Sequence, residues 1–311
     1  MSTDNYNIIV SILAIVFIFL YAIHKFSINI ENIFEDDIKK ILHKWTRVPI
    51  IGALIGFIIT AIVQSSTAMS VLLVAMTRSK LIPLAGALAV LIGVNLGTTL
   101  TIQLISFRIL DIAPYIIILG FFLMKTRTKY QMYGESIFYF GIIFSCLYLI
   151  SVITHPFADS PFMLQFASLS SNIWLGILIG FVLTNIVQSS TIMTSIIVIL
   201  AAKGILDFDQ SFALILGSNI GTTTTALIAS LASNRDGKRV ALAHFLFSFI
   251  GVILILPFVD TFSNFIKNLS IPLYSQVAFS HFLFNFVISI VFLVFFKYYK
   301  MLVMILIRDK K

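Results

Sequence analysis

Hydrophobic residues in this chain occur in long runs, and short segments between the runs carry most of the charges. A helix needs about 20 apolar residues to cross a bilayer. Seven runs meet this requirement and are predicted to be full membrane spans, at 7–24, 81–106, 109–124, 134–154, 210–232, 239–259 and 273–297. The pattern predicts an all-α polytopic membrane protein.

Two other apolar segments are interrupted by polar residues. One contains "TAIVQSST" at 60–67 and the other contains "TNIVQSST" at 184–191. Roughly 15 apolar residues precede each motif and about 11 follow it, too few on either side to cross the membrane. We therefore predict re-entrant helical hairpins at 48–77 and 173–202, each turning at Gln-Ser-Ser-Thr.

The two hairpins belong to an internal duplication. "GALIGFIITAIVQSST" at 52–67 and "GILIGFVLTNIVQSST" at 176–191 share 12 of 16 residues at an offset of 124. "IGVNLGTTLT" at 92–101 and "LGSNIGTTTT" at 216–225 share six of ten at the same offset. A constant offset predicts two repeats. The predicted organisation is an N-terminal part (1–47), repeat 1 (48–154), an outer linker (155–172), repeat 2 (173–297) and a short cytoplasmic tail (298–311).

The distribution of basic residues predicts how the chain sits in the membrane. With the N-terminus outside and the C-terminus cytoplasmic, the inner segments hold 18 of the 21 Lys and Arg residues. This asymmetry follows the positive-inside rule. The two hairpins then enter from opposite sides, so the repeats have inverted topology, as in many secondary transporters. Residues 31–47 have apolar positions at helical spacing, and we expect an amphipathic helix on the inner surface.

Composition narrows the functional classes. The chain is 59% hydrophobic and 11% charged, and its net charge of +8 is spread over short loops, which does not indicate a nucleic-acid partner. A single cysteine, Cys146, excludes an intramolecular disulfide and a CxxC metal site. The first apolar run lacks a basic segment before it, so we expect a retained helix rather than a cleaved signal peptide. A cell-membrane location, embedded in the lipid bilayer, is expected.

The Gln-Ser-Ser-Thr turns carry the first candidate chemistry. They place hydroxyls, a carboxamide and the N-terminus of the second hairpin arm at membrane depth, where irregular backbone must be buried or line a wet cavity. Helix N-termini bind anions, including phosphate. Two such tips approaching from opposite faces would enclose one small oxyanion.

The N-x-G-T-T blocks offer neutral oxygens, and their glycines permit either close backbone approach or local unwinding. Oxygens of this kind coordinate Na⁺ in membrane transporters. The core segments contain no Lys or Arg, so cations bound together with the anion would relieve its desolvation cost. His244 and His281, at two similar helix starts, are predicted to serve packing or hydrogen bonding rather than catalysis.

At these motifs the chain resembles the type II sodium-dependent phosphate cotransporter family, bacterial members included. The family is marked by a duplicated Q-S-S-[ST] motif and by N-I-G-T-[TS] downstream. The resemblance implies import of inorganic phosphate coupled to Na⁺ by alternating access, with no other cofactor. It implies phosphate binding by Gln64, Ser65, Ser66, Gln188, Ser189 and Ser190. It also implies Na⁺ binding by Thr67, Asn95, Thr98, Thr99, Thr191, Asn219, Thr222 and Thr223.

Other functions share part of this pattern. A transporter of another small oxyanion, an H⁺-coupled carrier and a passive anion channel stay open. The alternative structural explanation is that the Ser, Thr and Gly residues of these motifs only let membrane helices pack closely together. An enzyme is not expected, because the serines have no neighbouring base and the chain lacks HExxH, GxSxG and Walker A motifs.

Overall fold

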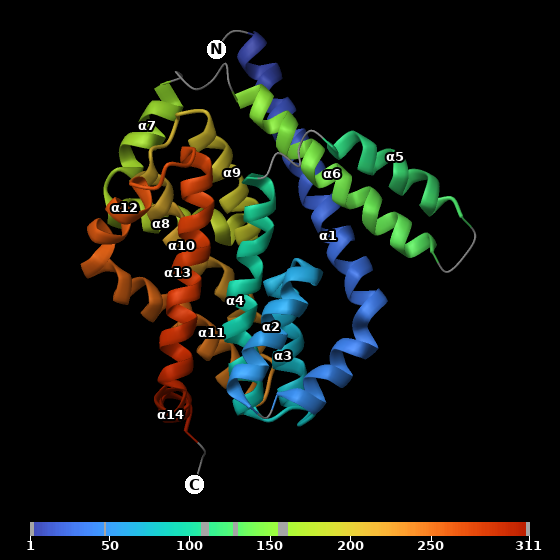
Figure 1. The fold of residues 1–311 in the computed structure, drawn as a ribbon, viewed down its shortest axis with the longest axis vertical. Coiled ribbons are helices and arrows are strands. Elements are labelled where there is room, and N and C mark those ends of the chain that lie inside the picture. Colours follow the sequence, from blue (N-terminus) through green and yellow to red (C-terminus); the bar gives the residue numbers. More distant parts are fainter. Residues whose placement is uncertain (1–2, 47, 107–111, 127–129, 155–160, 309–311) are drawn as a thin grey trace.

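The computed structural model describes residues 3–46, 48–106, 112–126, 130–154 and 161–308, and throughout these ranges the regular elements are helices. This confirms the all-α prediction. In chain order the helices are α1 (Thr3–Trp45), α2 (Pro49–Val63), α3 (Ser66–Arg78), α4 (Leu84–Ser106), α5 (Ala113–Met124), α6 (Gln131–Thr154), α7 (Pro161–Ser170), α8 (Ile173–Val187), α9 (Ser190–Ala202), α10 (Phe208–Ser230), α11 (Arg235–Ile255), η3 (Leu256–Phe258), α12 (Val259–Lys267), α13 (Leu273–Val294) and α14 (Phe296–Leu306) (Figure 1).

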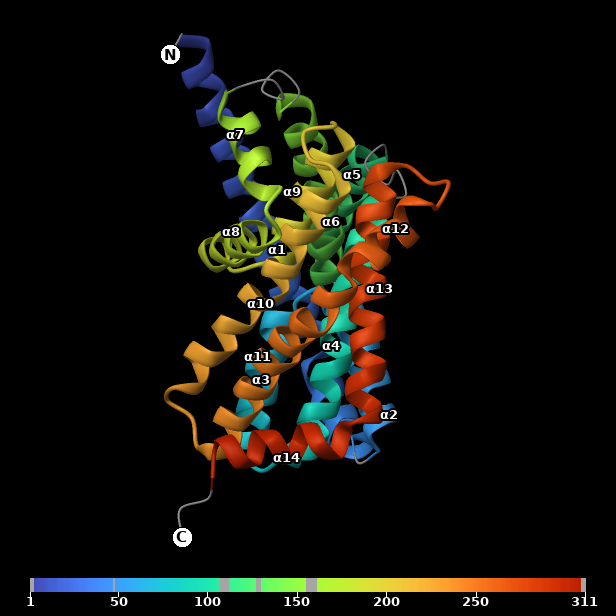
Figure 2. The ribbon, with the colours of Figure 1, turned by 90° about the vertical axis from the view of Figure 1, so that its left-hand side faces the viewer.

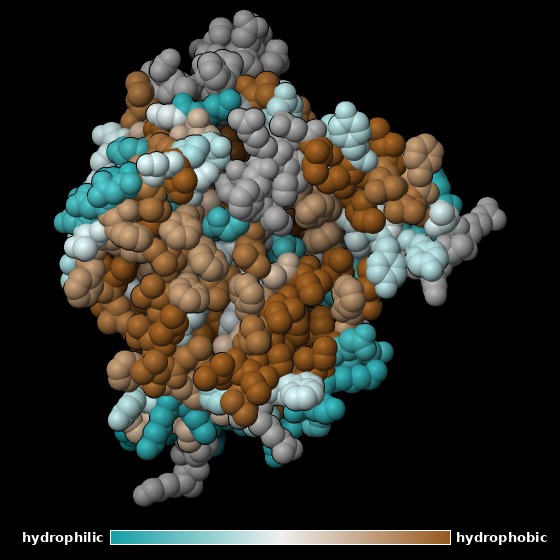
Figure 3. Space-filling model, viewed as in Figure 1, coloured by the Kyte–Doolittle hydropathy of each residue, from teal (hydrophilic) through white to brown (hydrophobic). Residues whose placement is uncertain are grey.

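The surface is that of a multi-pass membrane protein. Hydrophobic side chains cover the middle of the face in Figure 3, and hydrophilic side chains gather toward its edges. In the described residues, five helical segments are long and apolar enough to cross a membrane, or six if the bent pair α7–α8 is one span. They include Gln131–Ile150, Phe208–Ser230 and Leu273–Val294, which overlap three predicted spans.

Some predicted spans differ from the observed helices. Predicted span 109–124 contains only the 12-residue helix α5, and its residues 109–111 lie outside the described residues. Near the N-terminus, the apolar segment found among the described residues, Ala14–Phe34, overlaps the predicted span 7–24 and extends beyond its end. The expected surface helix at 31–47 is not separate: α1 continues from the apolar segment as one helix of 43 residues to Trp45. No proline or glycine occurs between residues 3 and 45 to stop it.

The duplication appears as repeated packing. In each repeat the first hairpin arm lies against a long helix, α2 against α4 and α8 against α10. The two pairs approach closely at equivalent glycines. A Cβ on Gly93 would lie 1.8 Å from the carbonyl oxygen of Ala53, and one on Gly217 would lie 1.9 Å from that of Ile177. The backbone contact at these positions therefore excludes any larger residue.

The long helices of the two repeats run in opposite directions along the molecule. In Figures 1 and 2, α4 starts at the lower end and rises, whereas α10 starts at the upper end and descends. The start of α1 and the end of α14 also lie at opposite ends (Figure 1). This arrangement is that of inverted repeats, in which two hairpins can reach the centre from opposite sides.

Substitution of Gly93 by alanine is expected to destabilise the protein strongly. Overpacking typically costs ~1–3 kcal/mol, and we expect the upper part of this range because the obstructing atom belongs to the backbone. The measurement is the thermal unfolding midpoint in detergent. Gly251→Ala is the control, since the nearest atoms to its new Cβ belong to side chains, those of Ile288 at 3.0 Å and Phe284 at 3.5 Å. Equal midpoints for Gly93→Ala and the wild type would show that the close approach is not required.

Candidate functional site

Both Gln-Ser-Ser-Thr motifs break a helix in the same way. Gln64 and Gln188 end α2 and α8 in the left-handed region, with φ of 59° and 57°. Ser65 and Ser189 then cap α3 and α9, and their hydroxyls accept hydrogen bonds from Ala68 N–H at 3.1 Å and Ile192 N–H at 3.4 Å. A non-glycine residue in the left-handed region is uncommon. Its recurrence shows that the turn geometry itself is duplicated.

The two turns face one pocket. A cavity of about 270 Å³ is lined by all eight residues of the two motifs, Gln64 to Thr67 and Gln188 to Thr191. Its volume suits a small ion, since pockets for drug-sized ligands occupy ≈ 300–1,000 Å³. The sequence predicted that the tips would enclose a common space, and the structure brings them together.

The pocket is polar but has no fixed charge from carboxylate, ammonium or guanidinium groups. The first turns of α3 and α9 form part of its lining, so the positive ends of two helix dipoles point to it. The hydroxyl of each capping serine accepts a hydrogen bond from the backbone N–H three residues later in the chain. The N–H groups of the two residues in between have no acceptor within their helix. Such groups form an anion-binding arrangement.

Sequence reasoning missed one wall of this pocket. Helix α1 contributes Leu20, Ile23, His24 and Ser27 to the lining. His24 is exposed and Ser27 is buried, one turn apart on the same helix. A polar pair at positions i and i+3 inside an apolar run was the available signal, because side chains at this spacing share one helix face.

The N-x-G-T-T blocks lie elsewhere. None of their residues lines the 270 Å³ pocket, and both blocks sit inside the uninterrupted helices α4 and α10. Of the two roles expected for their glycines, the structure supports close approach. A Cβ on Gly97 would lie 2.6 Å from the carbonyl oxygen of Phe57, and one on Gly221 would lie 2.9 Å from that of Phe181.

The threonines of these blocks bond to their own helices. Thr98 and Thr222 donate to carbonyls four residues back, and Thr99 and Thr223 donate to carbonyls three residues back. Their hydroxyl oxygens keep lone pairs for a cation. Within the described residues no cluster of three His, Cys, Asp or Glu could hold a metal ion, so a cation here would depend on neutral oxygens.

Both asparagines of the blocks contact a buried histidine. Asn95 Oδ1 lies 3.2 Å from His244 Nε2, and Asn219 Oδ1 lies 3.1 Å from His281 Nε2. Asn95 also donates through Nδ2 to Leu91 O, which fixes its amide, so His244 donates through Nε2. The prediction that these histidines serve hydrogen bonding agrees with the contacts, which the sequence did not identify.

The two histidine clusters differ. In the first, His244 Nδ1 lies 3.1 Å from Ser70 Oγ. Ser70, His244 and Asn95 are thus connected by hydrogen bonds between their side chains. In the second, Asn219 Nδ2 and His281 Nδ1 are buried and have no hydrogen-bond partner. Thr194, at the repeat position of Ser70, is fully buried and its hydroxyl is also without a partner. The second cluster therefore holds three unsatisfied polar atoms, which a water or an ion would satisfy.

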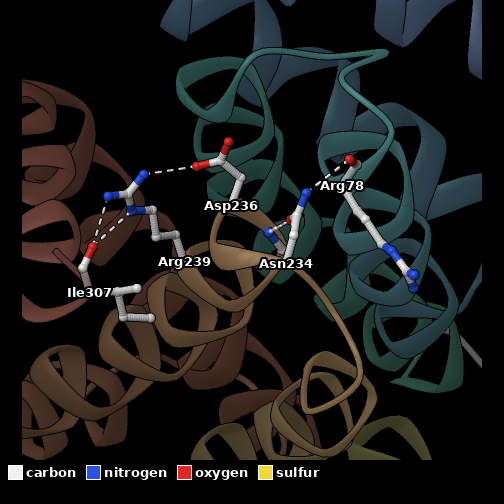
Figure 4. A network of polar contacts seen from close by, with 6 residues as sticks. Arg78, Asn234, Asp236, Arg239 and Ile307 are labelled. Carbon is white, nitrogen blue, oxygen red and sulfur yellow. Dashed lines mark hydrogen bonds and ion pairs between the residues drawn. The ribbon is translucent and has the colours of Figure 1, made fainter. Parts of the chain in front are cut away.

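Polar contacts also fix the end of the molecule that carries α14. Figure 4 shows Arg239 of α11 reaching Ile307 O and Asp236, and Asn234 reaching Arg78 O at the end of α3. Arg239 is 6% exposed, so its two partners share the cost of its burial. These contacts tie the second hairpin arm of repeat 1 to the start of α11 in repeat 2, and tie α11 to the residue that follows α14.

Comparison with known proteins identifies the class. A family model described as Na⁺/Pi-cotransporter matches residues 18–152 and 155–274. The chain therefore belongs to the Na⁺/Pi-cotransporter family, which consists of transporters and not enzymes. Na⁺-dependent cotransport of phosphate is the activity that defines this class, as the family description states.

Individual relatives include bacterial and mammalian proteins. YqeW of Bacillus subtilis (strain 168), an uncharacterized protein, is 30% identical over 85% of this chain and 86% of its own length. YjbB of Salmonella typhimurium, provisionally named an inorganic phosphate export protein, is 29% identical over 84% of this chain. The chain covers 49% of that relative's length. Sodium-dependent phosphate transport protein 2C of Mus musculus is 48% identical over 31% of this chain and 16% of its own length. No solved structure matches the chain.

Replacement of His244 by alanine is expected to destabilise the fold. His244 is fully buried, and its removal takes one of two hydrogen bonds from Ser70, which keeps its bond to Ser66 O, and takes the histidine donor from Asn95 Oδ1. A buried group left unsatisfied costs ~1–3 kcal/mol. Thermal unfolding in detergent measures the loss. His43→Ala is the matched control, because His43 is exposed and its ring bonds to the Leu81 carbonyl rather than to a buried side chain. If the unfolding midpoint of His244→Ala is no lower than that of His43→Ala, the hydrogen bonds of His244 with Ser70 and Asn95 do not stabilise the fold.

Proposed function

We propose that this protein imports inorganic phosphate together with Na⁺ by alternating access, with phosphate held between the two Gln-Ser-Ser-Thr turns. The observation that carries the proposal is the shared pocket: residues 124 positions apart line one polar cavity that two helix N-termini face. The phosphate ligands would be Gln64, Ser65, Ser66, Gln188, Ser189 and Ser190. Hydroxyls, carboxamides and backbone N–H groups all donate to an oxyanion.

Charge balance supports the coupling to Na⁺. No basic side chain of Lys or Arg lines the pocket, so a multiply charged anion would enter without a fixed counter-charge. Na⁺ bound nearby by Thr67, Thr191 and the N-x-G-T-T blocks would supply that charge. The candidate ligands of the blocks are Asn95, Thr98, Thr99, Asn219, Thr222 and Thr223.

The second repeat is the better candidate for such a cation. The amide orientation of an asparagine is assigned from its hydrogen bonds. Leu91 O fixes the orientation of Asn95, whereas Asn219 Nδ2 has no acceptor. If the Asn219 amide is reversed, Nδ2 donates to His281 and the carbonyl oxygen becomes free to bind Na⁺.

The orientation in the membrane follows from charge. We place the α14 end, with Arg78, Arg239 and Lys300, in the cytoplasm and the start of α1 outside. A symporter of this kind is reversible, and net transport follows the combined gradients of its ions. Import here and the export named for YjbB are therefore compatible with one mechanism.

The test is uptake of radiolabelled phosphate by liposomes that contain the protein. We expect uptake with an inward Na⁺ gradient and none above protein-free liposomes when K⁺ replaces Na⁺. Reversing the gradients should give Na⁺-dependent efflux. Uptake that follows a pH gradient and ignores Na⁺ would replace Na⁺ coupling by H⁺ coupling. If the protein is well folded and transports no phosphate, the proposed function is wrong.

Two variants place the site. Gln188→Gly removes the side chain and keeps the left-handed turn, since glycine adopts this conformation without strain. Ser190→Ala removes one hydroxyl, and Ser230→Ala is its control, because both serines are 5% exposed and Ser230 lies outside the pocket. We expect Gln188→Gly and Ser190→Ala to lower phosphate affinity about tenfold or more, the effect of losing a hydrogen bond to an ion. Unchanged affinity in both would exclude the second turn from the site.

A further inference from the structure

Helix α1 lies outside both repeats, yet it forms one wall of the pocket. His24 and Ser27 face the same space as the two turns. The chain outside the duplicated units therefore supplies polar groups where the repeats meet. Neither the family match nor the names of the relatives assign a role to these two residues.

The hydroxyl of Ser27 is buried and has no hydrogen-bond partner. Ser27 is 8% exposed, and it lines the cavity. A buried serine normally donates to a carbonyl of its own helix, as Ser136 does to Met132 O. An unpaired hydroxyl at the wall of a polar cavity is explained when the contents of the cavity complete its hydrogen bonding.

His24 occupies the middle of the apolar segment Ala14–Phe34. A polar side chain at this depth is costly against lipid and normally faces a wet cavity. It is the one pocket-lining residue with a titratable side chain. The neighbouring Lys25 is directed elsewhere, with Nζ 5.7 Å from the Tyr21 ring centroid. Glu135 on α6 accepts hydrogen bonds from Asn29 of α1 and from Gln131.

We infer that His24 and Ser27 are additional ligands of the oxyanion held between the two turns, an inference that rests on the proposed function. The serine hydroxyl and a ring N–H both donate, which is the chemistry an oxyanion requires. The imidazole is also the one group in the lining that can carry a positive charge opposite the anion. The site thus has three walls, one from each repeat and one from α1.

Transport kinetics test this inference. His24→Ala and Ser27→Ala should each raise the KM for phosphate about tenfold, as expected for loss of a hydrogen bond to an ion. The maximal rate should change less than the KM. His24→Gln, which retains an N–H donor, should stay within roughly threefold of the wild type. A KM within twofold of the wild type for both alanine variants would overturn the inference.

Matched controls separate binding from structure. His43→Ala changes the same residue type on the same helix, and Ser136→Ala changes a serine that is 4% exposed on α6. Neither residue lines the pocket, so both controls should keep the wild-type KM. A control that raises the KM as much as its partner variant would assign the effect to general perturbation and overturn the inference.

A second measurement does not depend on transport. Ser27→Cys is nearly isosteric, and the natural Cys146 is buried. Inorganic phosphate should slow the reaction of the new thiol with a water-soluble alkylating reagent severalfold, and sulfate should protect less. Equal rates with and without phosphate would reject Ser27 as a ligand.

The two proposals fail in different ways. If the wild-type protein takes up no phosphate, the proposed function is wrong. If the wild type takes up phosphate, and Gln188→Gly impairs uptake while both α1 variants keep the wild-type KM, only the third wall is wrong.

Discussion

The fold depends on one constraint, the need to satisfy backbone polar groups where helices are broken within the membrane. Both breaks fall at a glutamine in the left-handed conformation. On one side of each break, the glutamine N–H closes the preceding helix by donating to Thr60 O or Thr184 O. On the other side, the capping serine satisfies one N–H of the next helix. The remaining N–H groups of these helix starts need a polar surrounding, and the shared pocket provides it.

Holding two broken helices at this depth requires rigid supports. The uninterrupted helices α4 and α10 perform this task, because glycines let the hairpin arms contact their backbones directly. Small residues of this kind would by themselves be explained by close packing between helices. Here the same glycines also fix the positions of the hairpin arms, whose ends form the two Gln-Ser-Ser-Thr turns. The close packing therefore also determines the geometry of the site.

Much of this arrangement could be predicted from the sequence, because its causes are local. Apolar runs interrupted by Q-S-S-T predict broken helices, and the constant offset predicts that the breaks are equivalent. The sequence marks His24 and Ser27 as a polar pair on one face of an apolar helix, but it does not show which cavity they line, because the other walls come from residues far away in the chain. The pairing of His244 with Asn95 is of the same kind, as these residues lie 149 positions apart. The sequence did not predict that residues 31–45 continue α1 without a break, because a change in amphipathicity does not end a helix that has no breaking residue.

The repeats share their geometry but not their polar contacts. Thr184 donates to Ser218, whereas Thr60, its counterpart, has no partner because position 94 is valine. Conversely, the Ser70–His244–Asn95 chain is closed and the equivalent atoms around Asn219 are open. In alternating access by inverted repeats, the two halves exchange conformations between the inward-open and outward-open states. Identical halves would make these states equal in energy. The unequal networks remove that equality, so ligands that complete the open contacts of the second half would shift the population between the states.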